Sequence, residues 1–375
     1  MSGRDVRRHV GQLLIGSFHG PSVPPELRSL AREFDLGGVT LFGRNRNIES
    51  PEQVGELAWA SRALGAEWPA WVAIDQEGGR VARLRAPFTE WPAMAALGRA
   101  DDEQLARRFA RALARELRAV GISLDYAPVL DIHTNPSNQV IGDRALSDQS
   151  DRVARLGATI VGTLQDEGIV ACGKHFPGHG DTSTDSHHEL PLVAHPPDRL
   201  RAVEFEPFRA AIAADVGCIM TAHILVPALD AEHPATLSRA IVQGILRDEL
   251  GFQRVIISDD LEMRAIADRH AAPDAAVAAI AAGCDAVLLC AGDLDRHAAV
   301  LEGLIRASES ETLPLTRIED AMTRNRRLKE RMLTMGPRTL SPLGPEWTPP
   351  TAASLRDLLG CGEHQAIAAE MGEYV

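Results

Sequence analysis

One segment of the chain combines many titratable side chains with residues that prevent regular secondary structure. The stretch KHFPGHGDTSTDSHHELP, residues 174–191, holds four histidines and two aspartates around Pro177, Gly178 and Gly180. Proline and glycine at these positions exclude a continuous helix or strand, so we expect the histidines to lie on a loop. Three interpretations are open: a metal site, a loop that transfers protons, and a polar surface loop without chemistry.

The metal interpretation is the weaker of the two chemical ones. His175 and His179 are separated by Phe-Pro-Gly, so they cannot share one helix face as the two histidines of an HExxH motif do. The sequence has no second cluster with recognisable ligand spacing, although the fold could bring His133 or His223 near. We therefore expect no metal ion and no organic cofactor.

The proton-transfer interpretation rests on Asp185 and His187, which are two residues apart on the expected loop. At this spacing the carboxylate can accept a hydrogen bond from one ring nitrogen, which fixes the tautomer of the imidazole and stabilises its protonated form. A histidine supported in this way is suited to general acid and base catalysis near neutral pH. The alternative, in which Asp185 only stabilises a turn, remains open.

A pair of carboxylates follows an apolar run further along the chain. In VIISDDLEM, Asp259 comes directly after the run and Asp260 follows it. One of these side chains is the natural counterpart of the histidine in a nucleophilic mechanism. The alternation of side chains along a strand does not decide between them, because both lie at the strand end.

Strand-length apolar runs that alternate with helical patterns are expected to position these groups. The runs are residues 13–17, 38–42, 70–75, 122–127, 169–174, 217–222, 255–259 and 285–290. They are continuous, as in strands buried on both faces of a parallel sheet. Eight such runs predict an α/β fold, a single (β/α)8 barrel of the TIM type, with a doubly wound open sheet as the alternative. The open sheet is disfavoured, because the chain contains neither GxGxxG nor GxxxxGK[ST].

Residues 101–121, DDEQLARRFARALARELRAVG, give the clearest helical pattern. Apolar side chains recur at helical spacing, with Asp101 as the expected N-cap and Gly121 at the end of the helix.

A barrel of this type carries its chemistry on loops at the carboxyl ends of its strands. The polar residues that end or follow a predicted strand are Asp75, Asp131, Lys174, His175, His223 and Asp259. Surface residues without a role would be scattered instead. Because a lysine that ends an apolar strand needs a partner, we expect Asp75 and Asp131 to be neighbours of Lys174.

Composition excludes several classes of partner. The formal net charge is −13 and there is no run of lysine or arginine, so neither nucleic acid nor an anionic membrane surface is an expected partner. No stretch approaches the roughly 20 apolar residues needed to span a bilayer, and no apolar run of signal-peptide length precedes Gly16. We therefore expect a cytoplasmic protein, whose five cysteines are reduced thiols, most of them in the core.

The composition changes after Gly336. GPRTLSPLGPEWTPP contains five prolines and predicts an extended or wrapping segment, and residues 351–375 are expected to form one or two short helices. We expect residues 1–336 to form the catalytic barrel and residues 337–375 a proline-rich segment and C-terminal tail. A monomer is expected rather than an oligomer.

Six segments together resemble glycoside hydrolase family 3, and within it the bacterial β-N-acetylglucosaminidases. In chain order they are DQEGGRVARLR (75–85), APVLDI (127–132), IGDRALS (141–147), KHFPGHGDTSTDSHHELP (174–191), MTAHI (220–224) and ISDDLEM (257–263). The resemblance covers roughly residues 10–335, and the histidine-rich segment is its most specific part. It implies a barrel-shaped glycosidase that needs neither a metal nor a cofactor.

The resemblance also implies roles for individual residues. Asp259 matches the family's nucleophile, His187 matches its unusual acid and base, and Asp185 matches the partner of that histidine. The residues that match positions holding the terminal sugar's hydroxyls and N-acetyl group are Asp75, Arg83, Arg144, Lys174 and His175. From the residues alone, the two arginines could equally be surface side chains in salt bridges.

The implied reaction is a retaining double displacement that removes a terminal non-reducing β-linked N-acetylglucosamine, with muropeptide fragments from peptidoglycan recycling as the expected substrate. Retaining glycosidases usually set two carboxyl groups about 5–5.5 Å apart, so a histidine acid departs from that pattern. Because a neutral histidine places no second anion beside the nucleophile, phosphate could replace water as the acceptor. The alternatives are a β-glucosidase or β-xylosidase of the same family, a metal-dependent barrel hydrolase, and a sugar-binding barrel without turnover.

Overall fold

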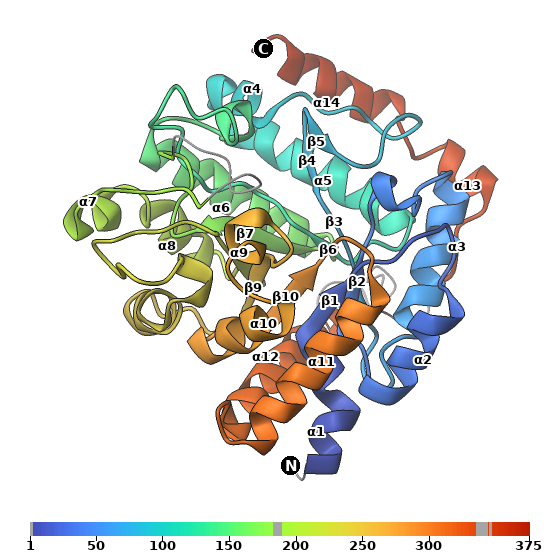
Figure 1. Ribbon diagram of the computed structural model, residues 1–375. Helices are drawn as coiled ribbons and strands as arrows, with labels where there is room; N and C mark the ends of the chain where they lie inside the picture. Colours follow the sequence, from blue (N-terminus) through green and yellow to red (C-terminus); the bar gives the residue numbers. More distant parts are fainter. Residues whose placement is uncertain (1–2, 183–189, 335–343, 345–346) are drawn as a thin grey trace.

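The chain folds as a closed barrel of eight parallel strands, in the order β1-β10-β9-β8-β7-β6-β3-β2 (Figure 1). The computed structural model describes residues 3–182, 190–334, 344 and 347–375. The barrel strands are β1 (Leu14–Gly16), β2 (Gly38–Thr40), β3 (Trp71–Ile74), β6 (Leu124–Asp125), β7 (Val170–Phe176), β8 (Cys218–Thr221), β9 (Val255–Asp260) and β10 (Ala286–Leu289). Closure confirms the predicted (β/α)8 barrel and excludes the open sheet.

Each barrel strand buries both of its faces, which explains the continuous apolar runs. In β3, Trp71 and Ala73 belong to the core inside the barrel, whereas Val72 and Ile74 belong to the core beneath the outer helices. Four of the five cysteines are buried and all five are free, as the sequence predicts. Because successive residues serve two different cores, both faces of a strand are mostly apolar.

Helices surround the barrel on its outer side (Figure 1). They are α1 (Gly3–His9), α2 (Pro25–Phe34), α3 (Pro51–Arg62), α4 (Met94–Ala100), α5 (Glu103–Ala119), α6 (Ser150–Asp166), α7 (Pro197–Ala202), α8 (Glu206–Ala213), α9 (Arg264–Ala267), α10 (Ala272–Ala282), α11 (Leu294–Glu309), α12 (Leu315–Thr334), α13 (Ala352–Arg356) and α14 (Gly362–Gly372). A π-helical segment, Ala240–Glu249, lies between β8 and β9. Within the described residues, no helix is both long and apolar enough for a membrane span.

The start of helix α5 differs from the prediction by one residue. Its N-cap is Asp102, whose side chain accepts hydrogen bonds from the backbone of Gln104 and Leu105. The predicted N-cap, Asp101, is wrong, because this residue adopts a left-handed conformation (φ 53°) that ends helix α4. Adjacent aspartates thus end one helix and begin the next, and both tolerate the conformation that their position requires.

Helix α12 closes the amino-terminal end of the barrel with a buried lysine. Lys329 Nζ donates to Gln12 Oε1 at 2.9 Å and to the Gly37 carbonyl at 3.0 Å, and it lies 5.5 Å from the centre of the Trp71 ring. These residues precede or begin strands β1 to β3. Burial lowers the pKa of Lys329 to about 7, and Asp35 only partly offsets this effect.

The C-terminal residues pack against the outer helices of the barrel. Helix α14 lies against α4 and α5, and α13 lies against α3 (Figure 1). The buried carboxylate of Glu116 ties this segment to the barrel, because it accepts hydrogen bonds from Gly360 N and Thr89 Oγ1 and contacts His364 Nδ1 at 2.9 Å. Helices α13 and α14 are the two short helices that the sequence predicts for residues 351–375.

Candidate active site

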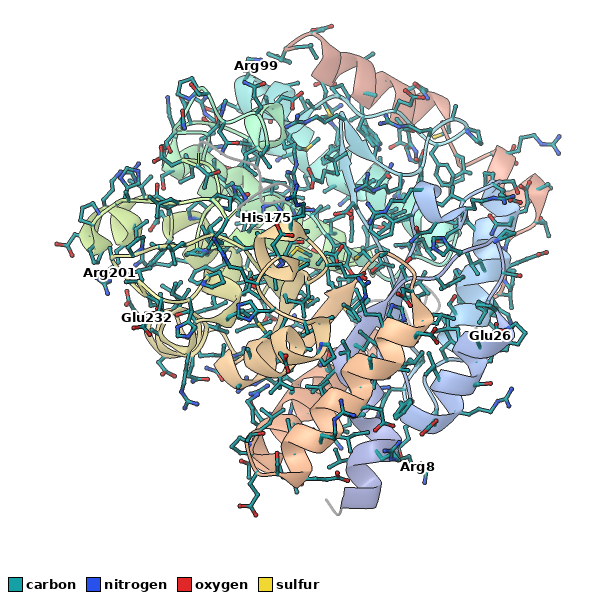
Figure 2. All side chains as sticks on the ribbon, in the orientation of Figure 1. Arg8, Glu26, Arg99, His175, Arg201 and Glu232 are labelled. Carbon is teal, nitrogen blue, oxygen red and sulfur yellow. The ribbon has the colours of Figure 1, made fainter. Side chains whose placement is uncertain are left out.

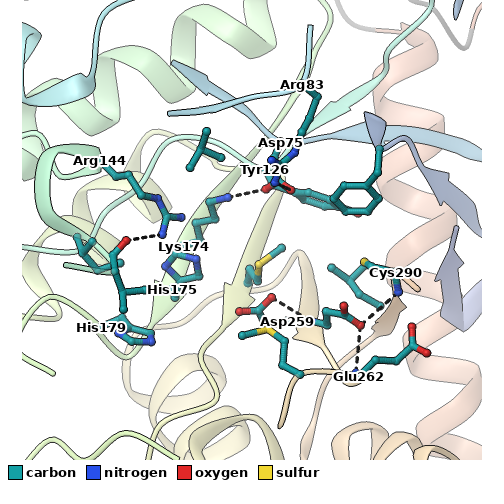
Figure 3. A pocket seen from close by; sticks show the side chains of 18 of the residues that line it. Asp75, Arg83, Tyr126, Arg144, Lys174, His175, His179, Asp259, Glu262 and Cys290 are labelled. Atoms are coloured by element: carbon teal, nitrogen blue, oxygen red, sulfur yellow. Dashed lines mark hydrogen bonds and ion pairs between the residues drawn. The ribbon is translucent and has the colours of Figure 1, made fainter. Parts of the chain in front are cut away.

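A cavity of about 310 Å³ opens at the carboxyl-terminal end of the barrel (Figure 3). The predicted site residues that line it are Asp75, Arg83, Arg144, Lys174, His175 and Asp259. In Figure 2, His175 lies inside the ring of elements, whereas Arg8 and Arg201 lie at the periphery. The fold therefore brings together six predicted residues from segments far apart in the chain.

Five charged side chains form a continuous ladder along one side of the cavity. Asp75 accepts hydrogen bonds from Arg83 Nη2 at 3.1 Å and from Lys174 Nζ at 2.8 Å (Figure 3). Lys174 Nζ also lies 2.6 Å from Glu77 Oε1. Glu77 in turn accepts two hydrogen bonds from Arg144, at 2.8 and 2.9 Å. The lysine is thus shared between two carboxylates, and an arginine stands at each end of the ladder.

The ladder remains charged at neutral pH. Burial alone raises the pKa of Asp75, but Lys174 and Arg83 outweigh it and hold that pKa well below its usual range. Burial likewise raises the pKa of Glu77, yet Arg144 and Lys174 lower it to about 2. Burial lowers the pKa of Lys174, but the two carboxylates outweigh it and the net shift is upward. The ladder therefore presents fixed hydrogen-bond donors and acceptors of the kind that bind sugar hydroxyls.

The sequence predicts that Asp75 and Asp131 are both neighbours of Lys174. This prediction is confirmed for Asp75 and is wrong for Asp131. Asp131 accepts instead from His175, with Oδ2 2.6 Å from His175 Nδ1, and from the backbone N–H of His179 at 2.6 Å. Burial raises the pKa of Asp131, but His175 outweighs it and the net shift is downward. This carboxylate orients the His175 ring at the cavity, because a proton on Nδ1 is the arrangement that lets the ring donate to it.

Asp259 and Asp260 both line the cavity, and their pKa values are shifted in opposite directions. Burial raises the pKa of Asp259, yet His223 and His175 outweigh it and leave the pKa below its usual value. Burial raises the pKa of Asp260 to about 7, although its Oδ1 accepts hydrogen bonds from Glu262 N and Cys290 N. Asp259 is therefore the carboxylate that remains an anion at neutral pH.

Asp185 and His187 lie outside the described residues, so their expected roles stay predictions. The described part of the same loop begins at the cavity, where His179 is one of the lining residues. Thr182 anchors this part, with Oγ1 2.8 Å from His179 Nδ1 and 3.3 Å from Asn138 Nδ2. The loop thus leaves strand β7 at the same end of the barrel as Asp259.

Sequence reasoning overlooked Glu77 and assigned Asp131 to the wrong partner. Glu77 follows Asp75 by two residues, and this spacing places two side chains on the same face of an extended segment. Strand alternation was the available signal for Glu77, whereas the contact between Asp131 and His175 depends on the path of two loops.

Within the part of the chain that the structure describes, no group of three or more histidine, cysteine, aspartate or glutamate side chains is placed to hold a metal ion. The histidine-rich segment lies partly outside this description, so the expectation of no metal ion stays a prediction.

Comparisons with known proteins find relatives over most of the chain. The profile described as "Glycosyl hydrolase family 3 N terminal domain" matches residues 5–328. Beta-hexosaminidase from Alkalilimnicola ehrlichii is 41% identical over 75% of this chain and 81% of its own length. Beta-hexosaminidase A from Pseudoalteromonas piscicida is 33% identical over 93% of this chain, which spans 60% of that protein.

Solved structures superpose over almost the whole chain. A glycoside hydrolase family 3 β-N-acetylglucosaminidase from Paenibacillus sp. str. FPU-7 has a TM-score of 0.88 at 39% identity, covering 98% of this chain and 68% of that one. NagZ from Neisseria gonorrhoeae has a TM-score of 0.76 at 31% identity, covering 96% of this chain and 97% of that one. The chain belongs to glycosyl hydrolase family 3, beside relatives that are named beta-hexosaminidases.

Proposed function

We propose that this protein is a retaining exo-β-N-acetylglucosaminidase. The observation that carries the proposal is Asp259, a cavity carboxylate whose pKa is kept below its usual value by neighbouring histidines. A carboxylate that is anionic at neutral pH is what a nucleophile needs to attack an anomeric carbon. The names of the hexosaminidase relatives support N-acetylglucosamine as the sugar that is removed.

The charged ladder is proposed to hold the terminal sugar. Lys174 and the two arginines donate hydrogen bonds, Asp75 accepts them, and His175 is oriented beside them by Asp131. These groups are fixed by one another before a substrate arrives, so little reorganisation accompanies binding. A cavity of about 310 Å³ lies at the small end of the ligand-pocket range. This size supports removal of one terminal residue rather than cleavage within a long chain.

The reaction is proposed to proceed in two displacements. In the first, Asp259 forms a bond to the anomeric carbon while the glycosidic C–O bond breaks and the departing oxygen takes a proton from His187. In the second, a water molecule attacks the anomeric carbon, His187 accepts its proton, and the bond to Asp259 breaks. Asp185 supports the imidazolium form of His187 in this scheme.

The natural substrate is proposed to be a muropeptide fragment, and peptidoglycan recycling in the cytoplasm follows as the biological setting. Both parts follow from the resemblance to the bacterial β-N-acetylglucosaminidases. Phosphate as an alternative acceptor also remains a prediction, and the product distinguishes it, since phosphorolysis yields sugar 1-phosphate.

A panel of 4-nitrophenyl glycosides tests the proposed activity. The β-N-acetylglucosaminide, β-glucoside and β-xyloside are compared at equal concentration, with and without EDTA. We expect the N-acetylglucosaminide to be cleaved fastest, with the β-anomer of the free sugar as the first product and no loss of rate after exhaustive chelation. Faster release from the glucoside or xyloside, inversion of configuration, or loss of activity with EDTA would each contradict the proposal.

A further inference from the structure

A histidine to which the proposed mechanism gives no role lies beside the strand end that carries Asp259. His223 follows strand β8 by two residues and is fully buried, and it is not among the described residues that line the cavity. Its ring nitrogen Nε2 lies 2.9 Å from the main-chain carbonyl of Asp260, and Nδ1 lies 2.9 Å from Thr236 Oγ1. The ring therefore connects the end of β9 with a short 3-10 helix, Ala235–Leu237.

The contact with Asp260 places a proton on the first ring nitrogen. A carbonyl oxygen only accepts hydrogen bonds, so Nε2 of His223 must carry a proton and donate it. The same carbonyl accepts from Met263 N at 3.0 Å, in the turn that follows β9. His223 thus holds the main chain directly after the proposed nucleophile.

The contact with Thr236 places a proton on the second ring nitrogen. The Thr236 hydroxyl has a single proton, and its oxygen lies 2.9 Å from the Ala222 carbonyl, which can only accept. Ala222 is fully buried, so a carbonyl left without a donor there would cost free energy. Because the hydroxyl proton is used on this carbonyl, Thr236 Oγ1 accepts from Thr221 Oγ1 and from His223 Nδ1, each at 2.9 Å. A ring that donates from both nitrogens is an imidazolium.

Asp259 supplies the negative charge that a buried imidazolium needs. The charged and titratable groups around Asp259 are Lys174, His175, His179, His223, Asp260 and Cys290. Lys174 is shared between the two carboxylates of the ladder, and His175 is bonded to a carboxylate of its own. Burial favours the neutral forms of His179, Asp260 and Cys290. Since a buried charge is costly without a partner, Asp259 and His223 compensate each other.

We propose that His223 is a positioning residue, the fixed positive charge that makes Asp259 a good leaving group in the second displacement. The inference rests on the proposed function for the covalent intermediate, and it adds the group that helps to release the sugar from it. His223 acts through Asp259 and the main chain of Asp260 and does not itself touch the sugar.

The proposed effect follows from where the electrons go in the second displacement. In the covalent intermediate Asp259 is an ester and carries no charge. A water molecule attacks the anomeric carbon and gives its proton to the proposed base, His187. The bond between that carbon and the carboxylate oxygen breaks, and its electron pair returns to the oxygen. The imidazolium of His223 is already in place to stabilise the carboxylate that forms, so no reorganisation is needed at this step.

The proton count can be measured on the unmodified protein without a substrate. Heteronuclear NMR detects which imidazole nitrogens carry a proton at pH 8, where an ordinary histidine, with a pKa of about 6.5, is almost entirely neutral. We expect both nitrogens of His223 to be protonated. His297 is the internal reference, because burial lowers the pKa of this histidine to about 4 and its ring should be neutral. A single protonated nitrogen on His223 would overturn the inference, whatever glycoside the protein cleaves.

Kinetics of the His223→Gln variant test the effect on the second displacement. Glutamine keeps a donor for the Asp260 carbonyl and removes the charge. With the 4-nitrophenyl glycoside that is cleaved fastest, we expect kcat at pH 8 to fall by about 10–100-fold and KM to fall in parallel, so that kcat/KM stays within about threefold. A burst of nitrophenol equal in amount to the enzyme should precede the slow steady state, because the covalent intermediate accumulates.

The matched control is His297→Gln, which removes another buried histidine, on helix α11 and not among the described residues that line the cavity. This variant should change kcat by less than about twofold and should give the same burst as the unmodified protein. Equal losses of kcat and kcat/KM in His223→Gln, without a burst, would show a merely structural role and would overturn the inference. If the unmodified protein cleaves no glycoside, the proposed function has failed, and the NMR measurement still decides the charge of His223.

Discussion

The two ends of the barrel each bury a lysine, and their surroundings change its pKa in opposite directions. At the carboxyl-terminal end, Lys174 lies between Asp75 and Glu77, and its pKa is raised despite burial. At the amino-terminal end, Lys329 contacts an amide oxygen and a backbone carbonyl, and its pKa falls to about 7. Burial is similar at both sites, so the charge of the partners decides the outcome.

This difference separates the end of the barrel that we propose to be functional from an end that we propose to be structural. Lys174 stays charged and, with its partners, forms a permanent array that a sugar can bind. Lys329 closes the barrel through neutral oxygens and an aromatic ring, and Asp35 only partly offsets the effect of burial. Each of the following substitutions tests whether the two ends are specialised in this way.

Removing the proposed nucleophile gives the largest expected effect at the carboxyl-terminal end of the barrel. Asp259→Ala should lower kcat by about 10⁴-fold or more, because no other group can form the covalent intermediate. The unfolding transition in urea should remain cooperative, since the side chain is half-buried and bonds only to the backbone N–H of Asp260 among described partners. Substantial residual turnover would move the nucleophile elsewhere, and Asp260→Asn is the first variant to examine in that case.

Removing the predicted general acid, His187, tests whether the carboxyl-terminal end of the barrel catalyses the reaction as well as binding the sugar. His187→Ala should slow the release of poor leaving groups, such as a second sugar, by about 10²–10⁴-fold. Nitrophenyl glycosides should lose much less, since nitrophenolate departs without a proton. Equal losses on both substrate types would remove His187 from the acid role.

Replacing the lysine at the active end should affect both stability and activity. Lys174→Met leaves Asp75 and Glu77 with one arginine each, and breaking a buried ion pair of this kind costs about 3–5 kcal/mol in the free energy of unfolding. We also expect kcat/KM to fall by about 10²-fold, because a donor fixed against the sugar is lost. Urea unfolding and nitrophenyl assays measure the two effects, and a variant of normal stability would show that the ladder does not stabilise the fold.

Lys329→Met is the corresponding substitution at the amino-terminal end of the barrel. Its effect on the free energy of unfolding should be small and should depend on pH. The native Lys329 loses its proton near pH 7, whereas the unfolded chain retains it to about pH 10.4. Between these values the native state binds fewer protons, so this group makes stability rise with pH, by up to about 1.4 kcal/mol per unit. Below pH 7 both states bind the proton and the contribution is constant at its least favourable value.

Lys329→Met should remove this dependence while kcat stays within about twofold, because the side chain lies at the opposite end of the barrel from the cavity. The measurement is the difference in unfolding free energy between the unmodified protein and the variant at pH 6, 7 and 8. A difference that is flat across this range would show that Lys329 keeps its proton, and the contrast between the two ends would then be lost.

The barrel can be predicted from the sequence, because each strand packs into two apolar cores and therefore appears as a continuous apolar run. It also contains enough to place Asp75, Lys174 and Asp259 at one end, since the carboxyl ends of parallel strands converge. The pairing of charges was harder to predict. Asp131 and Asp75 both end or follow a predicted strand. Only the paths of their loops bring Asp131 to His175 and Asp75 to Lys174.

Two other features cannot be predicted from sequence patterns. Lys329 stands in the charged stretch NRRLKERM, where a lysine normally faces solvent, and only the docking of α12 across the barrel shows that it is buried. The boundary between α4 and α5 falls between two adjacent aspartates that are both suited to capping. For Lys329 the deciding contacts come from residues distant in the chain, whereas for the aspartates the left-handed backbone of Asp101 decides which of the two caps α5.

The attachment of helix α14 makes the C-terminus a rigid mounting point. Glu116 fixes Gly360 and His364 to the outer wall, and Arg99 donates to the Tyr374 carbonyl near the last residue of the chain. A fluorophore or immobilising group placed on Val375 would therefore keep a constant orientation relative to the cavity. Such a probe would report rotation of the whole barrel in anisotropy measurements, with little independent motion of its own.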